Sequence, residues 1–107
     1  MLNDPQFVEA ARVLAERVLQ NKTDIDEQLI LAYRLLTGIS PEIKVIQLLK
    51  QHYLEQKNHF EKTPANAKQL LAVGQSPLKT DRPLAEVSAM TVVCNTIMSF
   101  DETIMKR

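Results

Sequence analysis

The chain has 107 residues, with 13 lysine and arginine side chains balanced by 13 aspartate and glutamate side chains, and no tryptophan. This length is that of one domain over residues 1–107, and basic residues scattered without a run argue against a surface for nucleic acid or anionic membrane. The single cysteine, Cys94, excludes an internal disulfide, and the apolar runs are too short for membrane insertion as a spanning helix.

Most of the expected helix starts combine a capping side chain with a proline. The side-chain oxygen accepts a bond from a free backbone N–H, and proline suits the first turn because its missing N–H costs nothing there. Four proline starts are Asp4-Pro5, Ser40-Pro41, Thr63-Pro64 and Arg82-Pro83, the last with Asp81 as the expected cap. A fifth start is predicted at Thr23, which pairs with Asp26 as in a capping box.

Apolar residues at helical spacing predict helices over residues 5–20, 24–37, 41–62, 64–73 and 83–107. Gly38 and Gly74 are suitable stops after the second and fourth helices, and residues 75–82 form the one long loop. The inward stripe of the third helix is predicted to be Ile43, Ile46, Leu49, Tyr53 and Phe60, packing more loosely after Tyr53. No stretch alternates β-branched and polar residues as a strand would.

The last helix is expected to be the centre of the fold, because no other segment is apolar for so long. One side carries Val87, Met90, Cys94, Ile97 and Ile104. The other side is expected to be the polar side and carries Ser88, Thr91, Asn95, Ser99 and Glu102. The fold class predicted from these patterns is all-α, with about five helices packed around a long C-terminal helix.

One cluster of residues and one single residue could in principle bind a metal or act in catalysis, but the sequence supports neither role. His52, Glu55 and His59 share a face of the third helix, but the two histidines are about two turns, or roughly 10 Å, apart. One ion cannot bridge them, so we interpret the group as a solvated polar face. Cys94, on the apolar stripe, is expected to be a buried and inert thiol. We therefore predict no catalytic, cofactor-binding or metal residue in this chain.

Asp101 is the most informative polar residue, because it follows Cys94 by seven positions on the apolar stripe. A carboxylate there is costly unless it is paired. We expect it to cap a neighbouring helix or to pair with Arg12, Arg34 or Arg82. Its role is predicted to be structural.

Three segments, taken in order, resemble a known family. They are residues 7–19, residues 32–38 followed by Ser40-Pro41-Glu42, and residues 70–77 leading to residues 92–103. Their order is similar to the C-terminal end of a family abundant in planctomycetes: large proteins with a domain of unknown function, often preceded by a cytochrome-c-like domain. The family pattern has an arginine after its glycine, where this chain has Ile39.

The resemblance implies that the chain is a fragment of a larger exported protein, in which any haem would belong to other domains. It carries over no reaction and no catalytic residue. We expect a structural or interaction module whose partners are other domains of the parent or another protein, without nucleic acid or cofactor. The alternatives are a part of an enzyme in a parent linked to redox or polysaccharide metabolism, and a free-standing intracellular adaptor. An exposed apolar patch would favour the module, and a pocket with perturbed titratable groups would favour the enzyme part.

Overall fold

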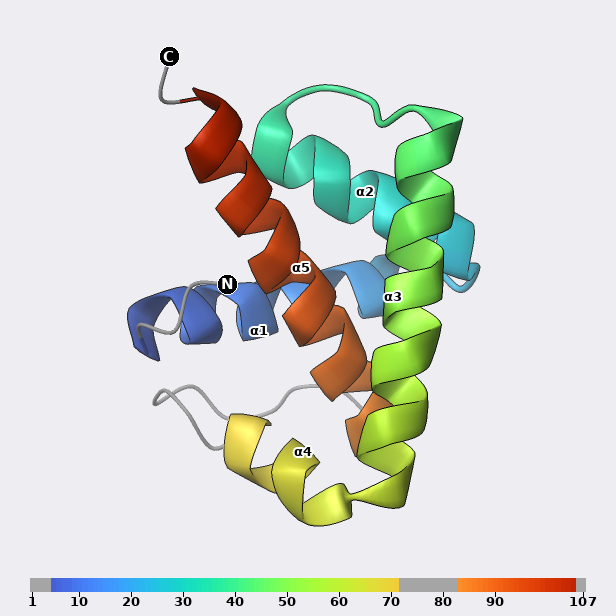
Figure 1. Ribbon diagram of the computed structural model, residues 1–107, viewed down its shortest axis with the longest axis vertical. Helices are drawn as coiled ribbons and strands as arrows, with labels where there is room; N and C mark the ends of the chain where they lie inside the picture. Colours follow the sequence, from blue (N-terminus) through green and yellow to red (C-terminus); the bar gives the residue numbers. More distant parts are fainter. Residues whose placement is uncertain (1–4, 72–82, 106–107) are drawn as a thin grey trace.

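The computed structural model describes the backbone of residues 5–71 and 83–105, and the side chains of residues 8–71 and 83–99. Within these ranges the chain forms five helices and no strand. They are α1 (Pro5–Asn21), α2 (Ile25–Thr37), α3 (Ile43–Lys62), α4 (Pro64–Leu71) and α5 (Leu84–Met105). The all-α prediction is confirmed (Figure 1).

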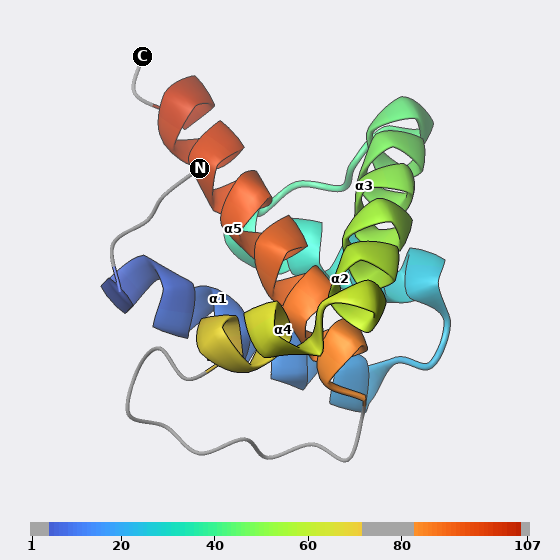
Figure 2. The same ribbon diagram turned by 60° about the horizontal axis from the view of Figure 1, so that its bottom comes forward.

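The C-terminal helix α5 is the centre of the fold, as predicted. All four other helices pack against it, and the contacts of α3 and α1 are the most extensive. Figure 1 shows α1 crossing α5 at a steep angle while α3 runs along its flank, and Figure 2 brings α4 forward at the end where α5 begins. The larger core cluster joins all five helices, with α4 contributing Leu71, and a smaller one joins Phe60 and Ala67 to Ala85 and Val92. None of the described helices has the length and apolar content needed to cross a bilayer.

The polar side predicted for α5 is wrong over its middle. Every residue from Val87 to Asn95 is buried, and the exposed fractions of Ser88, Thr91 and Asn95 are only 0%, 1% and 3%. At Thr91 the physical reason is a hydrogen bond within the helix, because its hydroxyl donates to the carbonyl of Val87 at 2.7 Å. The Ser88 hydroxyl, by contrast, is buried without such a partner among the described residues. A side without charges is inexpensive to bury, and the surrounding helices cover it. The side chains of Glu102 and Ile104 lie outside the described residues.

Three of the predicted capping residues, Thr23, Ser40 and Thr63, do not cap the helices expected for them. The N-cap of α2 is Asp24 rather than Thr23, since the Asp24 carboxylate accepts the N–H of Glu27 at 3.3 Å. Helix α3 begins only at Ile43, with Glu42 as its N-cap residue and no side-chain capping bond, so Ser40-Pro41 precedes the helix without capping it.

Thr63 acts on the helix before it rather than on the helix after it. Its hydroxyl donates to the carbonyl of His59 at 2.7 Å, at the end of α3, and only its backbone carbonyl accepts from Asn66 in the first turn of α4. Gly38 ends α2 as predicted: its φ is 80°, and its N–H donates to the carbonyl of Arg34 at 2.9 Å. Asp4, Asp81, Gly74 and the loop of residues 75–82 lie outside the described residues.

The stripe of α3 is right at its centre and wrong at its start. Leu49, Tyr53 and Phe60 are buried, but Ile43 is 73% exposed. Ile43 instead lines a shallow hollow together with Ile30 of α2. The expected loosening after Tyr53 is also wrong, because Phe60 is buried in the smaller core cluster that α4 completes. The most exposed aliphatic side chain of α3 is therefore the one at its N-terminal end.

Candidate functional site

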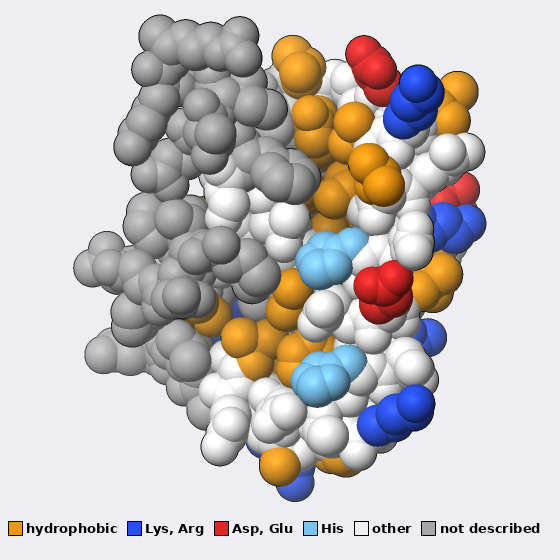
Figure 3. All heavy atoms as spheres, in the orientation of Figure 1, with side chains coloured by type: hydrophobic (Ala, Val, Ile, Leu, Met, Phe, Trp, Pro, Cys, Tyr) orange, Lys and Arg blue, Asp and Glu red, His pale blue; other side chains and the backbone are white. Residues whose placement is uncertain are grey.

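Most of the large aliphatic side chains that remain exposed belong to one pair of neighbouring helices in the described structure. Five of the six lie on α2, on α3 or on the connection between them: Leu35, Ile39, Ile43, Leu48 and Leu54. Val13 on α1 is the sixth. Figure 3 shows hydrophobic side chains at the surface beside the N-terminal half of α3. Isolated exposed aliphatic residues need no explanation, whereas their concentration on one pair of helices does.

A shallow hollow of about 360 Å³ lies between α2 and α3. Its lining is Asp26, Ile30, Ile43, Ile46, Gln47 and Lys50. The Lys50 Nζ atom is 3.3 Å from Asp26 Oδ1, and both side chains are nearly half exposed. This ion pair is a weak surface link between the helices. The hollow therefore offers isoleucine walls beside a rim whose two charged side chains, Asp26 and Lys50, form an ion pair.

A second hollow, of about 240 Å³, lies against α2 on the other side of Ile30. It is lined by Lys22, Glu27, Ile30, Leu31 and Arg34. Among the described residues, no carboxylate lies within salt-bridge distance of Lys22 or Arg34; the ion pairs found are Lys50–Asp26 and Arg12–Glu16. Ile30 belongs to both linings, so the two hollows are neighbours separated by one side chain. We call them the Ile30 hollows.

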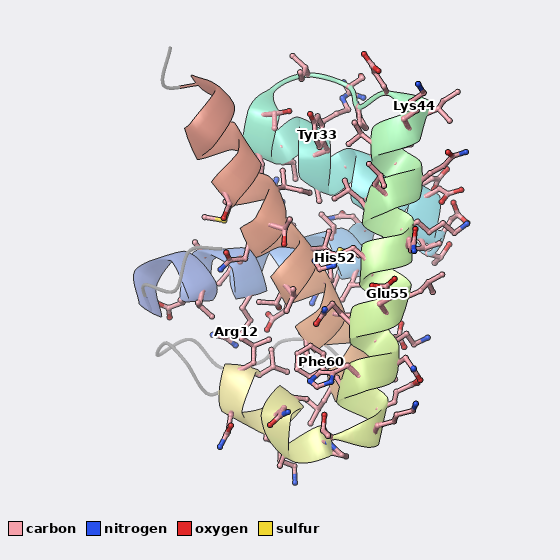
Figure 4. The ribbon with its side chains drawn as sticks, in the orientation of Figure 1. Arg12, Tyr33, Lys44, His52, Glu55 and Phe60 are labelled. Carbon is pink, nitrogen blue, oxygen red and sulfur yellow. The ribbon has the colours of Figure 1, made fainter. Side chains whose placement is uncertain are left out.

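The structure does not bring His52 and His59 together. His52 points from α3 toward α5, where its Nε2 atom is 3.2 Å from the Thr96 hydroxyl (Figure 4). Because that hydroxyl donates its proton to the carbonyl of Val92 at 2.9 Å, His52 must be the donor, and Nε2 carries a hydrogen. His59 instead lies 3.5 Å from the amide of Asn66, and Glu55 accepts from Gln51 on the exposed side. In the part of the chain that is described, no three potential metal ligands cluster.

Cys94 is fully buried in the core, as predicted. Desolvation by burial raises the pKa of its thiol from 9.0 to about 12, so the thiol is protonated at neutral pH. A protonated, enclosed thiol is neither a nucleophile nor a metal ligand.

A buried ion pair was missed by the sequence reasoning. Arg12 (labelled in Figure 4) and Glu16 on α1 are 3.3 Å apart, and their side chains are only 1% and 8% exposed. Their spacing, four residues apart and interleaved with the buried Ala11 and Ala15, was the available signal. Both charged side chains are therefore part of the interior of the fold.

Asp101 lies within α5, but its side chain is outside the described residues, so its structural role stays a prediction. Of the proposed partners, Arg12 already pairs with Glu16, Arg34 lines a surface hollow, and Arg82 is not described.

Comparison of the chain with protein families, with curated proteins and with solved structures found no match. The candidate site therefore stands on its geometry alone: two hollows that share Ile30 of α2, the first of them also lined by the exposed Ile43 of α3.

Proposed function

We propose that this domain is a structural or interaction module of a larger exported protein, and that it docks another protein surface through α2 and the start of α3. The observation that supports the proposal is the concentration of exposed aliphatic side chains there. Ile39 and Ile43 are 62% and 73% exposed and only four residues apart, beside a hollow lined by further isoleucines. Fully burying an aliphatic side chain stabilises an association by roughly 1.5–3 kcal/mol. Covering this surface with a protein partner would therefore be favourable.

The fold supplies a rigid base for such a surface. The inner sides of α2 and α3 are anchored to the core by Leu29 and Ala32 on α2 and by Leu49 and Tyr53 on α3, all of them buried. The helix backbones that carry the outward-facing side chains of α2 and α3 are therefore held in place without the partner. A preformed surface has less side-chain and backbone freedom to lose on binding, which favours recognition of a defined partner.

The proposal is tested by photocrosslinking in cells of the protein's own organism. Benzoylphenylalanine is placed at position 43, and adducts are identified by mass spectrometry. Position 13 is the matched control, because Val13 is also an exposed aliphatic residue, 47% exposed, but lies on α1. We expect a defined protein adduct from position 43 that position 13 does not give.

A second variant tests whether the adduct depends on the aliphatic surface and is not caused by the benzoylphenylalanine side chain alone. Ile39→Asp introduces a charge at an exposed position and should abolish the adduct at position 43 while leaving the helical circular dichroism spectrum unchanged. Failure to form an adduct at position 43, or equal labelling from positions 13 and 43, would show that this surface is not a docking site.

A further inference from the structure

We propose that the Ile30 hollows bind an amphipathic helix of a partner protein, one that carries aspartate or glutamate residues along the edge of its apolar face. This inference rests on the proposed function and specifies the chemistry of the partner. It follows from the placement of the two hollows, from their apolar lining and from the charges that line the second one.

The spacing of the hollows favours a helix as the ligand. A single side chain, Ile30, separates them, so two anchoring groups of the partner must stand close together. Side chains three or four residues apart on a helix have their Cβ atoms about 5–6 Å apart and point the same way. Two such aliphatic side chains would straddle Ile30, one against Ile43 and Ile46 and the other against Leu31.

The charge at the second hollow favours an acidic partner. Lys22 and Arg34 line it together with Glu27, so the lining has one more positive than negative charge. Within the described residues neither cation has a carboxylate partner in a salt bridge, whereas Lys50 at the other hollow is already paired with Asp26. The Arg34 guanidinium can hold a carboxylate through two N–H groups, and Lys22 adds a second positive charge to the same hollow.

The arrangement also argues against a basic partner helix. A lysine facing Arg34 or Lys22 would face a like charge, and Glu27 alone cannot offset both cations. The preference should therefore show as a difference between otherwise identical ligands that differ only in the sign of their charge.

The test uses three blocked alanine-based helical peptides of about 15 residues. The first carries two leucines at i and i+4 with glutamates beside them. The second has lysines in place of the glutamates, and the third keeps the glutamates but has alanines in place of the leucines. Each is titrated into isotopically labelled protein, and amide chemical shifts report the position and the dissociation constant of binding.

We expect the glutamate–leucine peptide to shift the amides of Ile30, Arg34 and Ile43, and to bind about tenfold more tightly than the lysine peptide. The alanine peptide should not produce saturable shifts. The double variant Lys22→Glu, Arg34→Glu changes only exposed side chains, and it should reverse the order so that the lysine peptide binds more tightly.

Equal affinity for the glutamate and lysine peptides, or shifts scattered over other faces, would overturn the inference. So would concentration-dependent self-association that shifts the same amides without any peptide, because the occupant would then be a second copy of the chain. Any of these three results, together with a defined adduct from position 43, would reject the acidic helix while leaving the proposed function standing. Loss of that adduct would instead reject the proposed function.

Discussion

Replacing Ser88 with alanine should stabilise this protein, although the residue lies at the centre of the fold. The Ser88 side chain is completely buried on α5, and its hydroxyl has no hydrogen-bond partner among the described residues. Burying an unpaired hydroxyl costs about 1–3 kcal/mol in proteins. Alanine removes this cost, and it is also the better helix former.

The opposing term is small. Ser88→Ala removes one oxygen atom, and the space left costs only a few tenths of a kcal/mol at about 24 cal/mol per Å³. The net expectation is a gain of about 1–2 kcal/mol in the free energy of unfolding. In a domain of this size that gain raises Tm by about 4–10 °C.

The measurement is urea unfolding followed by far-UV circular dichroism, with Thr91→Val as the comparison. The Thr91 hydroxyl is equally buried but donates to the carbonyl of Val87, so its removal should lower stability by about 0.5–1.5 kcal/mol. The two substitutions should therefore shift the midpoint in opposite directions at an unchanged m value. A loss of stability in Ser88→Ala would mean that the hydroxyl has a partner, and that the reasoning about this side of α5 is wrong.

Four further outcomes follow from single residues. At neutral pH a thiol reagent should label Cys94 only when the protein unfolds, about 10³-fold or more slowly than in the unfolded chain, and rapid labelling of the native protein would refute its burial. The pKa of Cys94 in the folded state, about 12, exceeds the ordinary 9.0. The stability that the thiol contributes is therefore full below pH 9 and falls as the pH rises toward 12, a loss that Cys94→Ser should not show. His52→Gln keeps a donor near the Thr96 hydroxyl and should be about 1 kcal/mol more stable than His52→Ala in urea; equal midpoints would show that the bond contributes nothing. Gly38→Ala should cost about 1 kcal/mol in thermal unfolding through its φ of 80° alone, since open space surrounds the added Cβ, and an unchanged Tm would contradict the left-handed conformation. Asp101→Ala should lose about 1–3 kcal/mol and Asp101→Asn less, whereas a wild-type midpoint for the alanine variant would mean an exposed carboxylate.

The helices and the central place of α5 could be predicted because they depend on local and one-dimensional signals. The apolar period and Gly38 define α2, and the long run from Val87 onward has too few charges to face water. The exact caps could not be predicted, because neighbouring residues compete. Thr23 and Asp24 are both good capping types, and a difference of one residue in the start of α2 decides between them.

The burial of the weakly polar side of α5 could not be read from its sequence. Serine, threonine and asparagine occur on both the exposed and the buried side of a helix, so their spacing does not predict burial. They tolerate burial when a backbone carbonyl is within reach, as Thr91 shows. How many helices surround α5 is a property of the whole chain. The same limit applies to Ile43, whose place in an apolar stripe says nothing about whether a partner helix reaches the first turn of α3.

Two departures from simple patterning therefore have different meanings in this fold. Arg12 and Glu16 are charged residues inside the domain, and they are accounted for within it, since they pair with each other in the packing of α1. Ile39 and Ile43 are aliphatic residues on the surface of the domain, and the described part of the chain leaves them 62% and 73% exposed. Folding gains little from keeping isoleucine at positions so exposed, and water contact makes them an aggregation risk. Because no packing within the described residues accounts for these two isoleucines, this asymmetry supports the proposal that the docking surface lies at the start of α3.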